Sequence, residues 1–186
     1  LFVANGHVMQ FPTLTPLKQR PLLFRNLGGG RFTNIADTAG DYFQRGHMGR
    51  GAAAGDLDGD GDDDLVVSQT NEPLAVLINT TDLVHQLLVV KLVGTQSNRD
   101  AIGATALLTT DRRRLLRQVT GGGSYLSAGS RALVWGLGDT EKPLSLAIRW
   151  PGGELLELPW EQATGQFLIR EGADGVAAMD RAAGGD

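Results

Sequence analysis

The residues best suited to chemistry in this chain are six aspartates in the stretch DLDGDGDDD, residues 56–64. Asp56, Asp58 and Asp60 alternate with other residues, and Gly61 follows them. Two carboxylates held about 4 Å apart repel each other by roughly 4 kcal/mol at an effective dielectric constant near 20. No lysine or arginine lies within the stretch to offset this repulsion. A bound divalent cation would offset it, so the spacing predicts a metal site.

The spacing and the residue types together favour calcium. Alternate carboxylates on a tightly turning loop converge on one point, and Gly61 supplies the backbone freedom for the turn. Calcium takes six to eight oxygen ligands at about 2.3–2.6 Å, whereas magnesium keeps its waters and zinc prefers nitrogen and sulfur ligands. We expect side-chain oxygens from Asp56, Asp58, Asp60 and Asp64, and the backbone carbonyl of Asp62.

The sequence after the loop distinguishes it from an EF-hand. An EF-hand loop needs a bidentate glutamate at its position 12, and this chain has Val67 there. The loop also continues into the run LVV, which is typical of a strand rather than a helix. The pattern predicts a calcium loop between β-strands, with Asp63 facing solvent. The alternative is a solvated acidic turn that holds no ion.

Short β-strands are the elements expected to position this loop. The 26 glycines are scattered among alternating apolar runs, a composition typical of strands joined by tight turns. The pattern therefore predicts an all-β propeller, sandwich or barrel. The strand-like runs are Leu1–Ala4, Leu22–Asn26, Leu65–Ser68, Ala75–Asn79, Leu87–Val93, Ala104–Thr109, Leu115–Thr120, Ala132–Gly136, Leu144–Trp150, Leu155–Leu158 and Gln166–Arg170.

Composition excludes several classes of protein. Hydrophobic content of 41% and charged content of 20% are ordinary for a folded globular chain. A net charge of -4 argues against nucleic acid as the main partner. No apolar run approaches the ~20 residues of a membrane-spanning helix. The absence of cysteine excludes disulfides and thiolate metal sites.

A weak internal repeat occurs within the first 80 residues. LFVANG at Leu1 is similar to LVVSQT at Leu65, and each is followed by a run that ends in asparagine, LLFRN or AVLIN. The stretch HMGRGAAAGDLDGDGDDDLVVSQ, from His47, resembles the FG-GAP or VCBS repeat of integrin-type β-propellers. LLFRNLGGGRFTNIADTAG resembles the end of the same repeat, an outer strand and a Gly-rich turn. This resemblance implies one to two propeller blades over residues 1–82. A propeller needs at least four blades. We therefore expect the other blades of the same protein upstream of Leu1.

The second part of the chain resembles the ASPIC/UnbV domain, found in cartilage acidic protein and its bacterial relatives. The motifs are LVGTQSNRDAIGA at Leu92, GGGSYLS at Gly121, WGLGD at Trp135 and IRWPGG at Ile148. The resemblance implies a small transthyretin-like β-sandwich, which we place at residues 83–172. Residues 173–186 are expected to form a flexible tail.

Four residues of this second part are candidates for binding a ligand. Gly122 and Gly123 could line a groove with bare backbone, or they could mark a bulge or a close strand approach. Tyr125 and Trp135 could stack on a sugar, or they could belong to the core. The basic run from Arg112 to Arg114 is interpreted as a solvated turn, with contact to an anionic partner as the alternative.

No catalytic signature is visible, so we expect no enzyme activity. His7, His47 and His85 are far apart in sequence, and the chain contains neither G-x-S-x-G nor a P-loop. We expect a calcium-binding adhesion module that is secreted, extracellular or periplasmic. Extracellular calcium sites bind at about 10⁻⁴–10⁻³ M and stay filled only where calcium is abundant. Its partner would be a protein or a glycan. The alternatives are a carbohydrate-binding module and a purely structural cap on the propeller.

Overall fold

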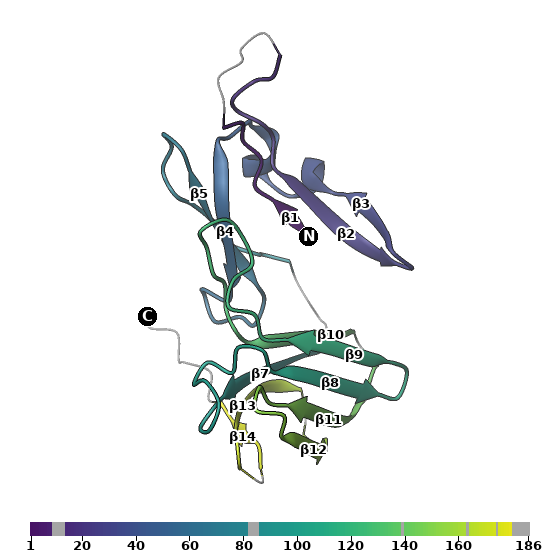
Figure 1. Cartoon of the computed structure of the whole chain (residues 1–186). Helices are drawn as coiled ribbons and strands as arrows, with labels where there is room; N and C mark the ends of the chain where they lie inside the picture. The colour runs from purple at the N-terminus through teal and green to yellow at the C-terminus, as the bar shows by residue number, and fades with distance from the viewer. Residues whose placement is uncertain (9–13, 82–85, 139, 163, 174, 180–186) are drawn as a thin grey trace. The chain divides into compact units, whose positions relative to one another are not determined.

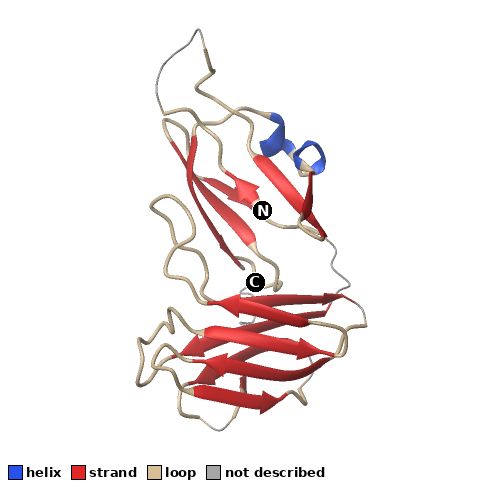
Figure 2. Cartoon of the chain, turned by 45° about the vertical axis from the view of Figure 1, so that its right-hand side comes forward, coloured by secondary structure: helices blue, strands red, loops and turns tan. Residues whose placement is uncertain are grey.

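The computed structural model describes residues 1–8, 14–81, 86–138, 140–162, 164–173 and 175–179, and in this part of the chain it is all-β (Figure 1). Fourteen strands and two short 3-10 helices form, with no α-helix among the described residues (Figure 2). No helix in this part is long and apolar enough to cross a membrane. The predicted fold class is confirmed.

The chain folds into two compact units. The first contains residues 1–57, 63–79 and 122–129, and the second contains residues 58–62, 80–121 and 130–186. The predicted boundary at residues 82 and 83 lies outside the described residues. An eight-residue segment between two strands of the second unit, residues 122–129, thus belongs to the first unit.

The first unit contains two three-stranded antiparallel sheets, with orders β1-β2-β3 and β4-β5-β6. Along the chain, the 3-10 helices η1 (Ala36–Thr38) and η2 (Asp41–Gln44) follow the first sheet and precede the second. The strands are β1 (Phe2–Val3), β2 (Leu22–Gly28), β3 (Arg31–Asn34), β4 (Gly49–Gly55), β5 (Asp64–Gln69) and β6 (Ala75–Leu77). The two pairs of similar sequence runs form equivalent pairs of antiparallel strands, β1 with β2 and β5 with β6.

The Gly-rich turn predicted after the second strand connects β2 to β3. Gly28, Gly29 and Gly30 have φ angles of 80°, 58° and 73°. Residues other than glycine rarely adopt this left-handed region. Three consecutive glycines therefore allow the chain to reverse here at little steric cost.

The second unit contains two four-stranded sheets, with orders β10-β7-β13-β14 and β12-β11-β8-β9. Its pairs are antiparallel except β7 with β13, which run parallel from Leu88 and Gly165 onward. The strands are β7 (Gln86–Val93), β8 (Thr105–Thr110), β9 (Arg114–Gln118), β10 (Leu133–Gly138), β11 (Pro143–Arg149), β12 (Leu155–Pro159), β13 (Gly165–Arg170) and β14 (Ala177–Ala178).

One hydrophobic core holds these two sheets together. Buried and less buried residues alternate along β8 and β10, as they do in strands that turn one face to a core. Both sheets contribute to a single cluster of buried side chains, so the unit is a two-layer β-sandwich. Members of the cluster include Leu88, Val90, Leu108, Trp135, Leu146, Ile148, Trp150, Trp160, Phe167 and Ile169.

The predicted tail, from residue 173 onward, contains a short strand. Ala177 and Ala178 form β14, which pairs with Leu168 and Phe167 of β13. Val176 also packs against the core of the sandwich. The sequence GVAAM, residues 175–179, lacks the length and alternation of the other strands, and pairing with β13 rather than local preference orders it.

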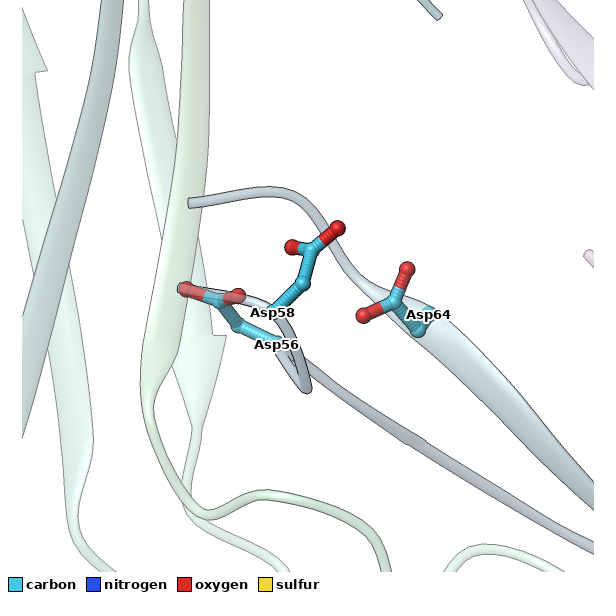
Figure 3. Close-up of side chains that lie close together, drawn as sticks. All are labelled: Asp56, Asp58 and Asp64. Carbon is cyan, nitrogen blue, oxygen red and sulfur yellow. The ribbon is translucent and has the colours of Figure 1, made fainter. Parts of the chain in front are cut away.

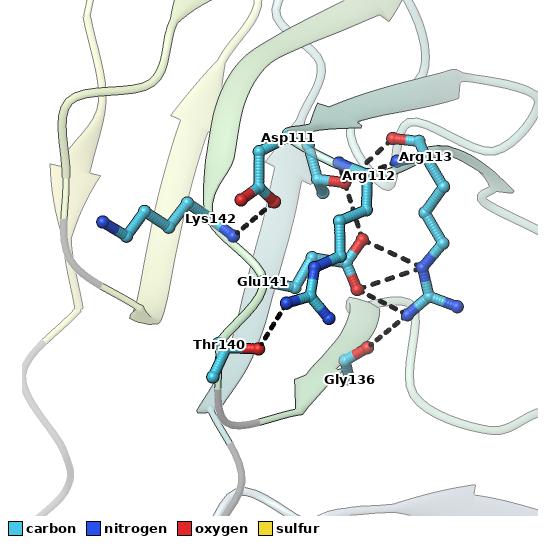
Figure 4. Close-up of polar contacts among 8 residues, drawn as sticks. Asp111, Arg112, Arg113, Gly136, Thr140, Glu141 and Lys142 are labelled. Carbon is cyan, nitrogen blue, oxygen red and sulfur yellow. Dashed lines mark hydrogen bonds and ion pairs between the residues drawn. The ribbon is translucent and has the colours of Figure 1, made fainter.

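The basic run lies at the β8–β9 hairpin and is partly used within the fold (Figure 4). Arg113 donates hydrogen bonds to both carboxylate oxygens of Glu141, from Nε at 2.9 and 3.0 Å and from Nη2 at 2.7 Å. The Thr110 hydroxyl donates to the same carboxylate at 2.6 Å. These hydrogen bonds from Arg113, opposed by burial, hold the pKa of Glu141 below its usual range. Arg113 is therefore a structural partner of a buried acid.

Replacing Arg113 by alanine is expected to destabilise the sandwich by about 2 kcal/mol, because the buried Glu141 carboxylate loses its charged donor. Chemical denaturation of the full chain measures this loss. Arg114→Ala, in the same hairpin, is the matched control and is expected to change the free energy of unfolding by less than about 0.5 kcal/mol. Equal losses in the two variants would contradict the structural role of Arg113.

Candidate metal centre

The acidic stretch forms the connection between β4 and β5. The two strands pair up to Gly55 and Asp64, so the register brings the two ends of the loop together. Gly59 and Gly61 have φ angles of 82° and 102°, in the region that favours glycine. The prediction that Gly61 supplies the freedom for a tight turn is confirmed.

Three carboxylates of this loop converge, those of Asp56, Asp58 and Asp64 (Figure 3). One oxygen from each lies within 4.8 Å of the others. Oxygens bound to one calcium ion at about 2.3–2.6 Å lie at most about 5 Å apart, so the three oxygens fit around a single ion. They are hard oxygen donors without nitrogen or sulfur, which suits calcium or magnesium.

Asp64 differs from the other two carboxylates because it is buried, with 1% of its surface exposed. Its Oδ2 atom accepts a hydrogen bond from the Leu57 N–H at 2.7 Å, and its Oδ1 atom accepts one from the Asn79 N–H at 2.8 Å. The first bond ties Asp64 to the start of the loop, and the second ties it to the end of the hairpin β5–β6. Asp64 is therefore oriented by the backbone, while Asp56 and Asp58 are exposed.

The other predicted ligands, Asp60 and Asp62, do not belong to the converging group. The Asp60 Oδ1 atom accepts a hydrogen bond from the Asp62 N–H at 2.8 Å, and the Asp58 Oδ1 atom accepts one from the Asp60 N–H at 3.2 Å. These Asx-type bonds shape the turn. Coordination by Asp60 and by the Asp62 carbonyl stays a prediction.

The Asp63 side chain is exposed, but protein atoms surround part of its carboxyl group. This partial burial raises the pKa of the carboxyl, and the excess of negative charge from Asp56 and Asp64 raises it further. A cation beside Asp56 and Asp64 would offset that excess.

The four candidate ligand-binding residues differ in how far they are exposed to solvent. Trp135 has no exposed surface, and its indole N–H donates to the Leu115 carbonyl at 3.2 Å. The expectation that Trp135 stacks on a sugar is therefore corrected, because the ring belongs to the core. Tyr125 is 65% exposed. A methyl group added at Gly122 or Gly123 would meet no described atom within 4 Å, so their surroundings are open.

Two buried acids that the sequence pattern did not reveal are Glu141 and Glu171, both in the sandwich. Glu171 Oε2 accepts hydrogen bonds from the N–H groups of Thr95, Gln96 and Ser97 at 2.9, 2.8 and 2.7 Å, and from the Ser97 hydroxyl at 2.9 Å. Both carboxylates are satisfied by protein donors. Their roles are structural, since those donors already hold them in place.

The fold and the site define an all-β protein with an acidic loop between two strands of a small sheet in its first unit and a β-sandwich in its second. Residues 14–67 match the FG-GAP-like repeat, and residues 94–175 match the family described as ASPIC and UnbV. The chain is thus an FG-GAP-like repeat followed by an ASPIC/UnbV domain. A comparison with curated proteins gave no match. The whole acidic loop, residues 56–64, lies inside the first matched segment, and Gly122, Gly123, Tyr125 and Trp135 lie inside the second.

Proposed function

We propose that this chain is a calcium-binding, non-enzymatic module of an adhesion or binding protein, and that calcium has a structural role in it. The observation that supports calcium binding best is the convergence of Asp56, Asp58 and Asp64 within 4.8 Å. FG-GAP-like repeats often bind calcium, and the loop lies at the end of the repeat matched here. Calcium would hold the end of β4 against the start of β5, because it would contact residues on both sides of their connection.

The same argument supports a location where calcium is abundant. Three converging carboxylates, two of them exposed, favour the affinity of extracellular calcium modules, about 10⁻⁴–10⁻³ M. A site of that affinity is filled outside the cell or in the periplasm. We therefore propose a secreted protein, with a protein or glycan partner and with further propeller blades upstream in the same polypeptide.

Carbohydrate binding receives less support from the structure. Of the two aromatic residues predicted to contact a sugar, Trp135 is buried and Tyr125 is exposed. One exposed ring offers a smaller stacking surface than two. We therefore place calcium binding before glycan binding in this proposal.

Calcium at about 10 mM is expected to stabilise the protein by about 1.4 to 2.7 kcal/mol, given an affinity of about 10⁻⁴–10⁻³ M. For a chain of this size such a gain raises the melting temperature by about 3 to 10 °C. Thermal denaturation followed by circular dichroism, with calcium or with a chelator, measures the shift. In Asp58→Ala the shift is expected to disappear. A wild-type protein that melts at the same temperature in both buffers would contradict the proposal.

A further inference from the structure

The segment of residues 122–129, between β9 and β10, packs beside strand β4 in the first unit. β4 is an edge strand of the sheet β4-β5-β6. An edge strand leaves a row of backbone N–H and C=O groups without a partner strand. The N–H of Ala52 in β4 donates a hydrogen bond to the Ser124 Oγ atom at 3.1 Å. The Ser124 side chain thus accepts a hydrogen bond that a backbone carbonyl of a neighbouring strand would otherwise accept.

Two glycines mark how closely the segment approaches β4. A methyl group added at Gly51 would overlap the Ser127 hydroxyl and the Tyr125 carbonyl. A methyl group added at Gly129 would lie 2.7 Å from the Ala54 carbonyl oxygen and 3.0 Å from the Ala54 nitrogen. Neither glycine has a φ angle in the left-handed region. Close approach of two backbones is therefore what requires glycine at both positions.

The segment is shaped for this contact by its own turn. The Ser127 N–H donates to the Ser124 carbonyl at 3.3 Å, and the Ser127 hydroxyl donates to the Tyr125 carbonyl at 3.0 Å. Leu126 has a φ angle of 46°, an uncommon conformation for leucine. The surrounding structure must hold this turn in place, because the leucine alone would not favour it.

The three positions of β4 at which the segment comes close lie just before the acidic loop. Gly51, Ala52 and Ala54 precede Asp56 by two to five positions. Without a cation, the repulsion among the three carboxylates opposes pairing of Gly55 with Asp64 at the end of β4. A cation removes that repulsion and fixes the surface on which the segment lies.

We propose that residues 122–129 cap the edge of β4 and that this docking is coupled to calcium binding at Asp56, Asp58 and Asp64. This inference rests on the calcium site proposed above. Coupling between two sites is reciprocal: calcium strengthens the docking, and docking strengthens calcium binding by the same factor. Factors of about 5 to 150 are typical of such coupling.

Hydrogen exchange of the full chain, with calcium chloride or with a chelator, tests the docking. In the wild-type protein, calcium is expected to slow amide exchange in a peptide covering residues 122–130 by about fivefold or more. Gly129→Ala places a methyl group against Ala54 and should abolish this slowing. Gly122→Ala is the matched control, because the same methyl group meets open space there. The control should behave as the wild type does.

Calorimetric titration of the same three proteins with calcium chloride tests the reciprocal effect. Gly129→Ala is expected to weaken calcium binding by about the factor by which calcium slows exchange in the wild type, and Gly122→Ala is expected to leave it unchanged. Calcium binding to the wild type without any change in exchange at 122–130 would overturn the coupling and leave the metal site intact. Absence of calcium binding would overturn both.

A second variant covers the case in which Gly129→Ala does not fold. Ser124→Ala removes the acceptor of the Ala52 N–H without adding bulk. It should speed exchange in residues 122–130 and weaken calcium binding in the same direction as Gly129→Ala. If Ser124→Ala retains wild-type exchange and wild-type calcium affinity, the proposed cap is wrong.

Discussion

Asp64→Ala is expected to destabilise the first unit by about 2 kcal/mol even in a chelator, because the Leu57 and Asn79 N–H groups lose a buried acceptor. Part of the loss is offset, since removing one carboxylate also lowers the repulsion with Asp56 and Asp58. In calcium the deficit grows by a further 1.4 to 2.7 kcal/mol, roughly the whole stabilisation by the ion. The two conditions thus separate the role of Asp64 as a backbone acceptor from its proposed role as a metal ligand.

Asp58 provides the contrast because its carboxylate is exposed. Asp58→Ala is expected to match the wild type in chelator to within about 0.5 kcal/mol and to lack the gain from calcium. Urea denaturation of the wild type and both variants, with and without calcium, separates the two roles. If Asp64→Ala were as stable as Asp58→Ala in chelator, the backbone role of Asp64 would be refuted.

The second large effect is the loss of stability that we expect at acid pH, when the Glu171 carboxylate becomes protonated. Burial raises the pKa of this carboxyl, but the N–H groups of Ser97, Gln96 and Thr95 and the Ser97 hydroxyl lower it to about 2, against 4.5 for an ordinary glutamate. A carboxyl whose pKa is lower in the folded state stabilises the fold above its unfolded pKa. That contribution is lost as the pH falls from 4.5 through about 2. At neutral pH it amounts to about 3 kcal/mol.

Glu171→Gln keeps the shape of the side chain and removes the charge. The wild type is expected to exceed this variant in free energy of unfolding by about 3 kcal/mol at pH 7, and the difference should shrink by about 2 kcal/mol at pH 3. Taking the difference between the two proteins at each pH cancels the titration of the other carboxyl groups. A difference that is independent of pH would show that the Glu171 charge does not stabilise the sandwich.

Much of the fold was predictable from local sequence. All eleven predicted strand-like runs coincide with strands to within a few residues, because apolar alternation and β-branched residues persist through them. β3 was missed, since all four of its residues are exposed and leave no alternation to detect. β4, with the sequence GRGAAAG, contains only glycine, alanine and arginine, so no apolar alternation marks it, although it lies in the stretch that resembles the FG-GAP repeat. β14 depends on pairing with β13.

The candidate site was predictable in part for a similar reason. Alternating aspartates with Gly61 lie close in sequence, so their convergence follows from local geometry. The acceptor role of Asp64 toward Asn79, and the contact of Ser124 with Ala52, join residues 15 and 72 positions apart. No spacing rule on a single sequence reveals such pairs. Trp135 shows the same limit, because the sequence does not say which aromatic faces the core.

Calcium binding measured directly on the full chain tests the central claim. Calorimetric titration of the wild-type protein with calcium chloride is expected to give one site per chain with a dissociation constant of about 10⁻⁴–10⁻³ M. Asp58→Asn should weaken this binding by about tenfold or more, since it replaces a charged ligand by a neutral one. A wild-type titration without saturable binding up to about 10 mM calcium, well above the dissociation constant expected of such a site, would contradict the account.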